Sequence, residues 1–194
     1  KPIQSGWHDQ TQSIFASLEL GYKSMLYLTM TGRNDWASQL AFSNQSSFFY
    51  PSVGMSAVVS NMVKMPKGID FLKVRASYSK VASAFSRFLS NPSYTYNNQT
   101  HQWQKPNTAP LDNMKPEDTK SWELGLNAKF LNNTINFDLT LYRSNTYHQT
   151  IYAASSSSSL YNRKIEQTGN IQNQGIELAV GYNNQWGKLG VQSN

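Results

Sequence analysis

Apolar and polar residues alternate along most of this chain with a period of two. The stretch from Phe71 to Ser79 reads FLKVRASYS, in which apolar residues on every second position are separated by Lys, Arg and Ser. Because successive side chains of a β-strand point to opposite faces of the sheet, this pattern predicts a strand with one apolar and one polar face. The chain contains no convincing helical pattern, so we expect an all-β fold.

The same alternation recurs and predicts about eight strands. Turn residues separate the closely spaced ones: Lys23 and Ser24 follow the first strand, and Asn132 and Asn133 follow the fifth. The predicted strands cover residues 13–22, 26–31, 52–60, 71–80, 121–130, 135–142 and 176–182, with a last one starting near Leu189.

Short and long connections alternate between these strands. The long connections are 36–50, 81–120 and 147–169. In an up-and-down meander, alternate connections lie at the same end of the sheet, so all short turns fall at one end and all long loops at the other. This is the layout of an outer-membrane β-barrel, which has short periplasmic turns and long extracellular loops.

Alternation alone also fits the half-buried strands of a soluble antiparallel β-sandwich. The positions of aromatic residues favour the membrane barrel, because they occur on the apolar parity at both ends of the strands, as two interfacial girdles require. These residues are Tyr78, Trp122 and Tyr147 at the long-loop ends, and Tyr22, Phe130 and Tyr182 at the short-turn ends.

Charged residues on the strands keep to the polar parity, with Arg143 near a long loop as the clear exception. We therefore predict that the apolar parity faces lipid and the polar parity faces a wet lumen. The predicted lumen-lining residues are Lys73, Arg75, Glu123, Lys129, Asp138 and Glu177, with Glu19 on the same parity. We further expect Lys73, Arg75 and Lys129 to be offset by acidic residues on neighbouring strands, because like charges directly opposite one another destabilise a sheet.

Composition narrows the possible functions. Charged residues make up 14% of the 194 residues and aromatic residues 13%, whereas charged residues reach roughly a quarter of an ordinary soluble domain. The formal charge of +6 is spread along the chain without a basic run, which argues against a nucleic-acid partner. The chain has no cysteine, which excludes disulfides and thiolate metal sites. The length favours a single domain.

No arrangement typical of an enzyme is found. His8, His101 and His148 lie far apart without metal-ligand spacing. Glu117 and Asp118 are adjacent carboxylates, but beside Pro116 they fit the end of a loop better than an acid/base pair. No Gly-rich phosphate loop or nucleophile elbow is present. We expect no catalytic residues, no metal and no cofactor.

Five segments resemble one protein family. They are LTMTGRNDWAS from Leu28, SFFYPSVGMSAVVS from Ser47, FLKVRASYSKV from Phe71, MKPEDTKSWELGL from Met114 and GNIQNQGIEL from Gly169. Their order and spacing resemble those of SusC/RagA-like TonB-dependent transporters, nutrient importers of the Bacteroidota outer membrane. One departure is Ser79, where the family often has glycine, and it affects only the local backbone.

The resemblance implies that residues 1–194 are an internal part of a single barrel domain, about eight strands of about 22, without the plug and the terminal strands. It implies multi-pass insertion in the outer membrane and import of glycan oligomers or oligopeptides. It also implies three partners besides membrane lipid: TonB, acting through regions absent here, a SusD-like surface lipoprotein, and the substrate.

The loop at 81–120 is the predicted contact for substrate or for the lipoprotein. Aromatic rings stack on sugars or peptide side chains, and the Asn and Gln around them supply directional hydrogen bonds. The candidates are Trp103, His101, Tyr94, Tyr96 and Phe88. Packing of these aromatics within the loop, as for Phe85, is the alternative. The alternative function is a secreted soluble β-sandwich that binds carbohydrate through its aromatic loops.

Overall fold

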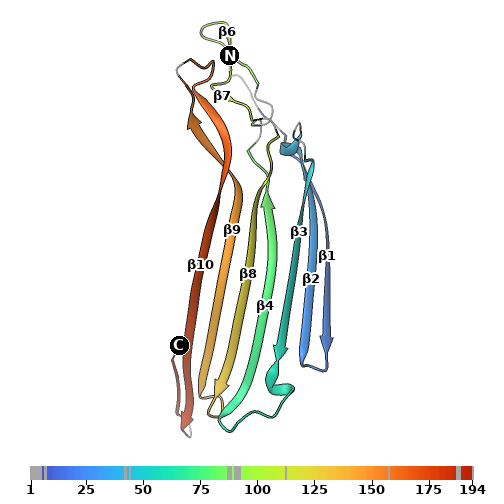
Figure 1. Cartoon of the computed structure of the whole chain (residues 1–194), viewed down its shortest axis with the longest axis vertical. Helices are drawn as coiled ribbons and strands as arrows, with labels where there is room; N and C mark the ends of the chain where they lie inside the picture. The colour runs from blue at the N-terminus through green and yellow to red at the C-terminus, as the bar shows by residue number, and fades with distance from the viewer. Residues whose placement is uncertain are drawn as a thin grey trace.

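Eight strands form one antiparallel sheet in a computed structural model of the chain (Figure 1). The structure describes residues 6, 8–41, 43, 45–86, 89, 93–111, 113–156, 158–186 and 189–193. The strands, in their order across the sheet, are β1 (Thr11–Tyr22), β2 (Leu26–Ala37), β3 (Ser47–Val58), β4 (Ile69–Ser83), β8 (Glu117–Phe130), β9 (Ile135–Ala154), β10 (Arg163–Trp186) and β11 (Leu189–Ser193). The predicted all-β, up-and-down meander is confirmed.

Smaller elements lie in the connections. Strands β5 (Thr95–Asn97) and β6 (Gln102–Gln104) form a separate hairpin, and β7 (Thr108–Ala109) pairs in parallel with β10. Two single-turn 3₁₀ helices, η1 (Ser38–Leu40) and η2 (Val59–Asn61), follow β2 and β3. Within the described ranges there is no helix with the length and hydrophobicity needed to cross a membrane.

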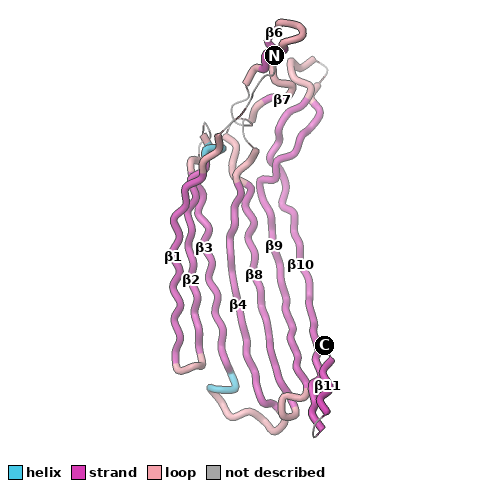
Figure 2. Tube along the Cα trace, turned by 180° about the vertical axis from the view of Figure 1, so that it is seen from behind, coloured by secondary structure: helices cyan, strands magenta, loops and turns pink. Residues whose placement is uncertain are grey.

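The tight turns gather at one end of the sheet and the longer loops at the other (Figure 2). Lys23 and Ser24 have φ angles of 48° and 53° in the β1–β2 turn. Asn132 and Asn133 have φ angles of 58° and 63° in the β8–β9 turn. Tight hairpins need this left-handed conformation, which Asn tolerates well. Both predicted turns are therefore confirmed.

The third predicted long loop, 147–169, is wrong. Strand β9 continues to Ala154 and β10 begins at Arg163, so the hairpin rises beyond its neighbours (Figure 1). The ladder is kept on both sides of His148 and Gly169, which lie opposite one another with φ angles of 58° and 87°. The sequence indicated a loop there because residues 147–169 lack the regular alternation of apolar and polar residues that marks the other strands.

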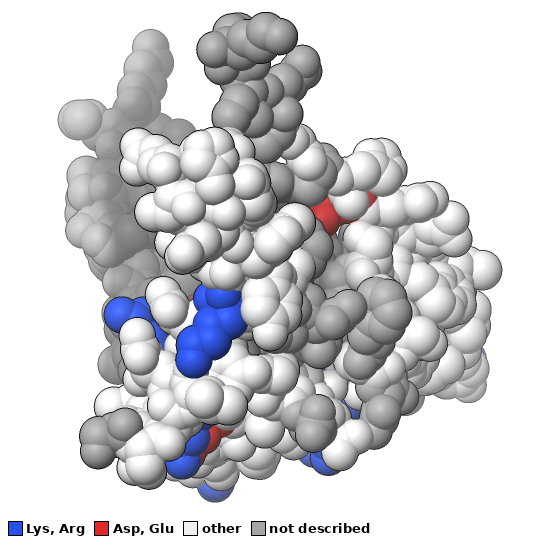
Figure 3. Space-filling model, turned by 90° about the horizontal axis from the view of Figure 1, so that it is seen from above, with Lys and Arg blue, Asp and Glu red and all other residues white. Residues whose placement is uncertain are grey.

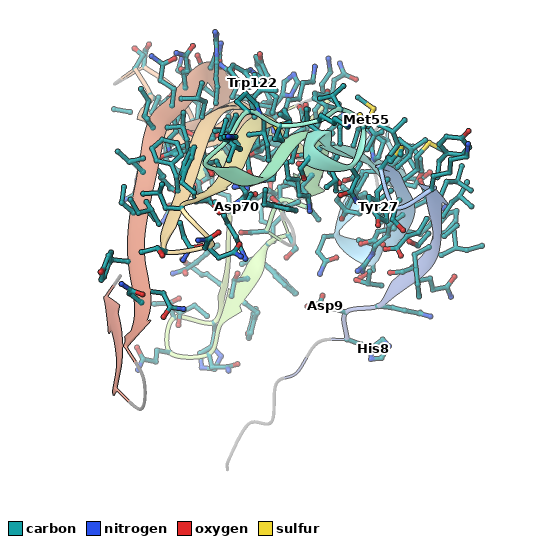
Figure 4. All side chains as sticks on the ribbon, turned by 90° about the horizontal axis from the view of Figure 1, so that it is seen from below. His8, Asp9, Tyr27, Met55, Asp70 and Trp122 are labelled. Atoms are coloured by element: carbon teal, nitrogen blue, oxygen red, sulfur yellow. The ribbon has the colours of Figure 1, made fainter. Side chains whose placement is uncertain are left out.

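The sheet is curved, and its two faces differ in chemistry (Figure 4). Met55 and Trp122 project from the convex side, whereas Tyr27 lies on the concave side. Register aligns apolar residues on the convex face into a continuous row: Leu20, Leu28, Met55, Ala76, Leu124, Leu141 and Ile176. Ile176 is 73% exposed. No second sheet packs on this face within the described residues, so the β-sandwich alternative is wrong.

The buried apolar cluster lies at the long-loop end. It joins side chains from separate segments: Leu40 of η1, Phe48 of β3, Phe85 and Met114 of the β4–β8 connection, and Ile165 of the raised part of β10. Leu40 and Met114 are each only 1% exposed. Because burial of apolar side chains is the main favourable term in packing, this cluster fixes three connections against one another. We call these five residues the loop core.

Candidate functional site

An arginine on the concave face gathers polar side chains from two neighbouring strands. Arg75 of β4 stands on the same row as Tyr27, and its Nε lies 3.4 Å from Oε1 of Glu123. Its Nη2 lies 3.2 Å from Oδ1 of Asp138 and donates to Oγ1 of Thr140 at 2.6 Å. Its Nη1 donates to Oδ1 of Asn127 at 2.6 Å. The planar guanidinium thus ties β4 to both β8 and β9.

The predicted pairing of lumen charges is confirmed for Arg75 and wrong for two other residues. Lys73 and Lys129 form no ion pair within the described part of the chain, and neither does Glu177. Lys129 instead places its Nζ 5.9 Å from the ring centre of Phe71. Glu123 and Asp138 both converge on Arg75 because its fork of N–H donors can bind two carboxylates at once.

Sequence reasoning did not identify Asn127 and Thr140 as members of this cluster. A signal was available in the spacing, since Asn127 lies four residues after Glu123 on the same face of β8. Thr140 stands two residues after Asp138 on the same face of β9. What the spacing could not give is the register that brings both strands to Arg75.

Next to the Arg75 cluster, on the side of the long-loop end, the concave face carries a row of small hydroxyl and amide side chains. Register places one such residue on each of seven strands: Ser17, Thr31, Ser52, Ser79, Ser121, Ser144 and Asn173. We call this row the hydroxyl row. Two shallow depressions of about 250 and 370 Å³ lie at or just below it and share Ser77 and Glu123 in their walls. The side chains of the hydroxyl row are small and uncharged, whereas the walls of the two depressions also contain Tyr27, Arg75 and Tyr142.

A second charged cluster lies nearer the long-loop end of the concave face. Arg33 Nε lies 2.7 Å from Oδ1 of Asp35, and the hydroxyl of Tyr50 donates to Oδ2 at 3.0 Å. Asp35 is only 5% exposed. Met30 shares a row with Trp122, and Asp35 follows Met30 by five residues along β2. At about 3.3 Å per residue, Asp35 lies about 16 Å closer to the long-loop end than Trp122 does.

Electrostatics in this second cluster follow from its contacts. The hydrogen bond from Arg33 holds the pKa of Asp35 below its usual range, against the opposing effect of burial. Burial raises the pKa of Tyr50 well above its usual range, and the hydrogen bond to Asp35 adds to this shift. Asp35 is therefore ionised and Tyr50 is a neutral donor near pH 7. The cluster braces β2 and β3 just before they enter the loop core.

Three of the predicted contact residues come together on the β5–β6 hairpin. The rings of Tyr96 and Trp103 meet edge to face with centroids 5.2 Å apart, and the Tyr96 hydroxyl lies 3.4 Å from Nδ1 of His101. Trp103 is 68% exposed. Tyr94, just before β5, is also exposed, and Phe88 lies outside the described residues. The aromatic faces at this tip are therefore available to a partner.

The tip is tied to the raised β9–β10 hairpin rather than extending freely. Lys105 Nζ donates to the backbone carbonyl of Leu160 and lies 5.8 Å from the ring centre of Tyr161. Phe85, from the same connection, is buried in the loop core. Packing thus accounts for Phe85, and it does not account for Trp103.

No group of three or more His, Asp or Glu side chains among the described residues is arranged to hold a metal ion. His148 Nδ1 lies 2.7 Å from Oδ1 of Asp118, and this pair sits at the bend of the β9–β10 hairpin. The contact joins β8 to β9 and holds the bend in place.

The profile of the TonB dependent receptor-like β-barrel family matches residues 2–194. The chain belongs to this family. Members of the TonB-dependent receptor family are outer-membrane β-barrel receptors and transporters rather than enzymes. The predicted resemblance is therefore confirmed at the level of family and fold.

Individual relatives agree with this assignment. The chain is 26% identical over 184 residues to TonB-dependent receptor P26 of Formosa agariphila, covering 90% of the chain and 18% of the relative. It matches a chain of the RagAB peptide transporter with a TM-score of 0.79 at 20% identity, covering 93% of this chain and 20% of that one.

A siderophore receptor shares the fold more distantly. PirA from Pseudomonas aeruginosa matches with a TM-score of 0.60 at 14% identity, covering 95% of this chain and 35% of that one. The TonB-dependent barrel segment described here spans about a fifth of the length of P26 and of the RagAB chain.

Proposed function

We propose that this chain forms part of the wall of a SusC/RagA-like importer in the outer membrane. It supplies about eight of the roughly 22 strands of a single barrel domain. The observation that carries this proposal is the in-register separation of an exposed apolar convex face from a polar concave face across seven strands. A soluble protein would leave the convex face in water, whereas a bilayer covers it.

The concave face then lines the lumen. The residues assigned to it are Lys73, Arg75, Glu123, Lys129, Asp138 and Glu177, together with the hydroxyl row. A wall of small hydroxyl and amide groups forms weak, replaceable hydrogen bonds with a polar solute and leaves room for it to pass. This chemistry suits import of large polar nutrients, glycan oligomers or oligopeptides, with energy supplied through TonB by other parts of the protein.

Adjacent residues on β4 test the orientation of the wall. The chain has no cysteine, so Ala76→Cys and Ser77→Cys can be compared in the full-length protein after any cysteines elsewhere are replaced. A charged, membrane-impermeant thiol reagent should label Ser77→Cys in intact outer membranes and leave Ala76→Cys unlabelled. Equal labelling of the two, or the reverse preference, contradicts the assignment of the faces.

The long-loop end is the proposed contact for substrate and for a SusD-like surface lipoprotein. Figure 3, which looks down on this end, shows Lys and Arg as separate blue areas on a mostly uncharged surface. Aromatic stacking is therefore a better candidate for recognition here than charge. Trp103, with His101, Tyr94, Tyr96 and Phe88, is the proposed contact group.

Replacement of Trp103 separates two ways in which it could act. In the full-length transporter, Trp103→Ala should weaken substrate binding while the complex with the lipoprotein persists if Trp103 stacks on the substrate. Loss of the lipoprotein complex with retained substrate affinity assigns Trp103 to the lid contact. Trp122→Ala, measured at equal amounts of assembled barrel, is the matched control because it removes an indole from the convex face. If neither binding changes, Trp103 has no recognition role.

A further inference from the structure

Two lysines stand directly opposite one another on the convex face. Lys80 of β4 pairs with Lys120 of β8, one row beyond the pair formed by Tyr78 and Trp122. Strands alternate their side chains, so both lysines share the convex side on which Trp122 is seen (Figure 4). The expectation that charges keep to the polar parity, with Arg143 as the clear exception, is therefore wrong for Lys80 and Lys120. Opposed residues have Cβ atoms about 5 Å apart, and like charges in this arrangement destabilise a sheet.

A third cation stands beside this pair. Arg143 of β9 lies opposite Trp122 and is a diagonal neighbour of Lys120. Its Nε donates to Oδ1 of Asn145 at 3.2 Å, and Lys120 places its Nζ 5.2 Å from the ring centre of Tyr147. Neither Lys120 nor Arg143 forms an ion pair with a carboxylate within the described residues.

The available acidic group is already engaged. Asp118 Oδ2 lies 3.9 Å from Lys80 Nζ, while its Oδ1 lies 2.7 Å from His148 Nδ1. Asp118 is the one carboxylate found in an ion pair with any of the three cations, counting the described residues only. Counting the described residues only, the cluster therefore keeps a net positive charge that no carboxylate balances in full.

This positive cluster lies at a sharp chemical boundary on β4, β8, β9 and β10. The two rows that contain it carry polar or aromatic side chains: Lys80, Lys120, Asn145 and Gln172 in one, and Tyr78, Trp122, Arg143 and Gln174 in the other. The next row toward the short turns is wholly apolar: Ala76, Leu124, Leu141 and Ile176. Hydrogen-bond donors thus border the apolar row on the side of the long-loop end, and the apolar row itself is suited to contact acyl chains.

We propose that these two rows form a binding site for the phosphate of an anionic glycolipid in the outer leaflet. Lysine and arginine bind phosphate through charge-assisted hydrogen bonds, and the amides of Gln172 and Gln174 can bind the sugar that carries it. The acyl chains then lie along the apolar row below. The bound phosphate places a negative charge between Lys80 and Lys120 and removes their repulsion.

The site rests on the proposed orientation, in which the long-loop end faces the cell exterior and the convex face meets lipid. Position supports a lipid rather than a soluble anion, because the cations border the apolar face instead of the concave wall. Long basic side chains near the ends of membrane-spanning segments commonly reach toward headgroups.

The test uses the purified full-length transporter in a neutral detergent and three probes. These are monophosphoryl lipid A, the same lipid after removal of its phosphate, and inorganic phosphate. Binding is read by native mass spectrometry and by the shift in thermal unfolding. The phosphorylated lipid should bind to the wild type, and Lys80→Gln/Lys120→Gln should bind it about tenfold or more weakly.

Two variants make the result specific. Lys73→Gln removes one positive charge from the concave face of the same strand and should leave lipid binding unchanged. Lys80→Arg/Lys120→Arg keeps both charges and should retain binding. Equal binding of the two lipids, or undiminished binding by the double glutamine variant, overturns the proposal.

Inorganic phosphate separates a lipid site from a free-anion site. If phosphate alone at the lipid concentration protects the protein as well as the lipid does, the site is one for soluble anions and the lipid proposal fails. Whether the convex face meets lipid is tested separately. The thiol labelling of Ala76→Cys and Ser77→Cys answers that question without any lipid probe. A correctly oriented barrel that does not distinguish the two lipids overturns only the headgroup site.

Discussion

Arg75 lies directly over Gly125, its partner on the neighbouring strand, so that a Cβ at Gly125 would overlap with the Nε, Cζ and Cγ atoms of the arginine. The glycine thus provides the space in which the guanidinium can lie flat along the concave face. From there it reaches Glu123 on β8 and Asp138 on β9. A residue without a side chain is in this way part of the charge cluster.

Gly125→Ala should destabilise the assembled barrel by about 1 to 3 kcal/mol, the usual cost of overpacking. The added methyl group displaces Arg75 from Glu123 and Asp138. Urea unfolding of the full-length protein in detergent micelles measures the change. Gly54→Ala is the matched control, because a Cβ there meets no atom within 4 Å. If the two variants are equally stable, the space above Gly125 is not required.

Leu139→Arg should hinder assembly by about 2 to 4 kcal/mol, because it places a charge on the lipid side near the bilayer midplane. Leu139 pairs with Leu126, which lies midway along β8 between Trp122 and Phe130. Ser77→Arg introduces the same charge on the concave face, opposite Glu123, and should assemble almost normally. Heat-modifiable mobility of the protein from outer membranes measures assembly. Equal assembly of Leu139→Arg and wild type would show that this face does not meet lipid.

Acid should loosen the long-loop end through Asp35. Its pKa in the folded protein is depressed by the hydrogen bond from Arg33, so its stabilising contribution is present above the unfolded value of about 3.9 and lost as pH falls through the folded value. Asp35→Asn should therefore lower the stability by about 1 to 3 kcal/mol at pH 7. The difference from the wild type should narrow below about pH 4.

Thermal unfolding of the full-length protein between pH 7 and pH 3 measures this dependence. Arg33→Gln removes the main cause of the shift and should reduce the acid sensitivity in the same window. A gap between wild type and Asp35→Asn that stays constant across this range would show that the ionisation of Asp35 does not contribute.

Truncation of the loop core should loosen the connections without preventing insertion of the wall. Ile165 is 4% exposed, and Ile165→Ala should cost about 2 to 5 kcal/mol of local stability, as large-to-small core substitutions do. Limited proteolysis of the long connections in intact membranes should become faster. Ile171→Ala, on the same strand but with the isoleucine 55% exposed, is the matched control. Unchanged proteolysis of Ile165→Ala would show that the three connections do not depend on one another.

Strand positions and faces could be predicted from the sequence because they follow from local chemistry. The alternation in FLKVRASYS fixes which side chains of β4 share a face, and Asn132 and Asn133 favour the left-handed turn that they adopt. Both signals lie within a few residues of chain. The same local signal failed around His148 and Gly169, where the sequence does not alternate regularly and the backbone bends, although the strand pairing continues.

The sequence by itself determined the number of strands in the main antiparallel sheet, their two faces, the ends at which turns and loops lie, and the family. Tertiary structure alone decided which charges meet, because a contact between strands depends on register over long separations in sequence. Arg75 takes both carboxylates and leaves Lys73 without one, and Lys80 stands opposite Lys120. It also decided that Phe85 is buried while Trp103 is exposed, because burial in a loop depends on what other segments bring to it.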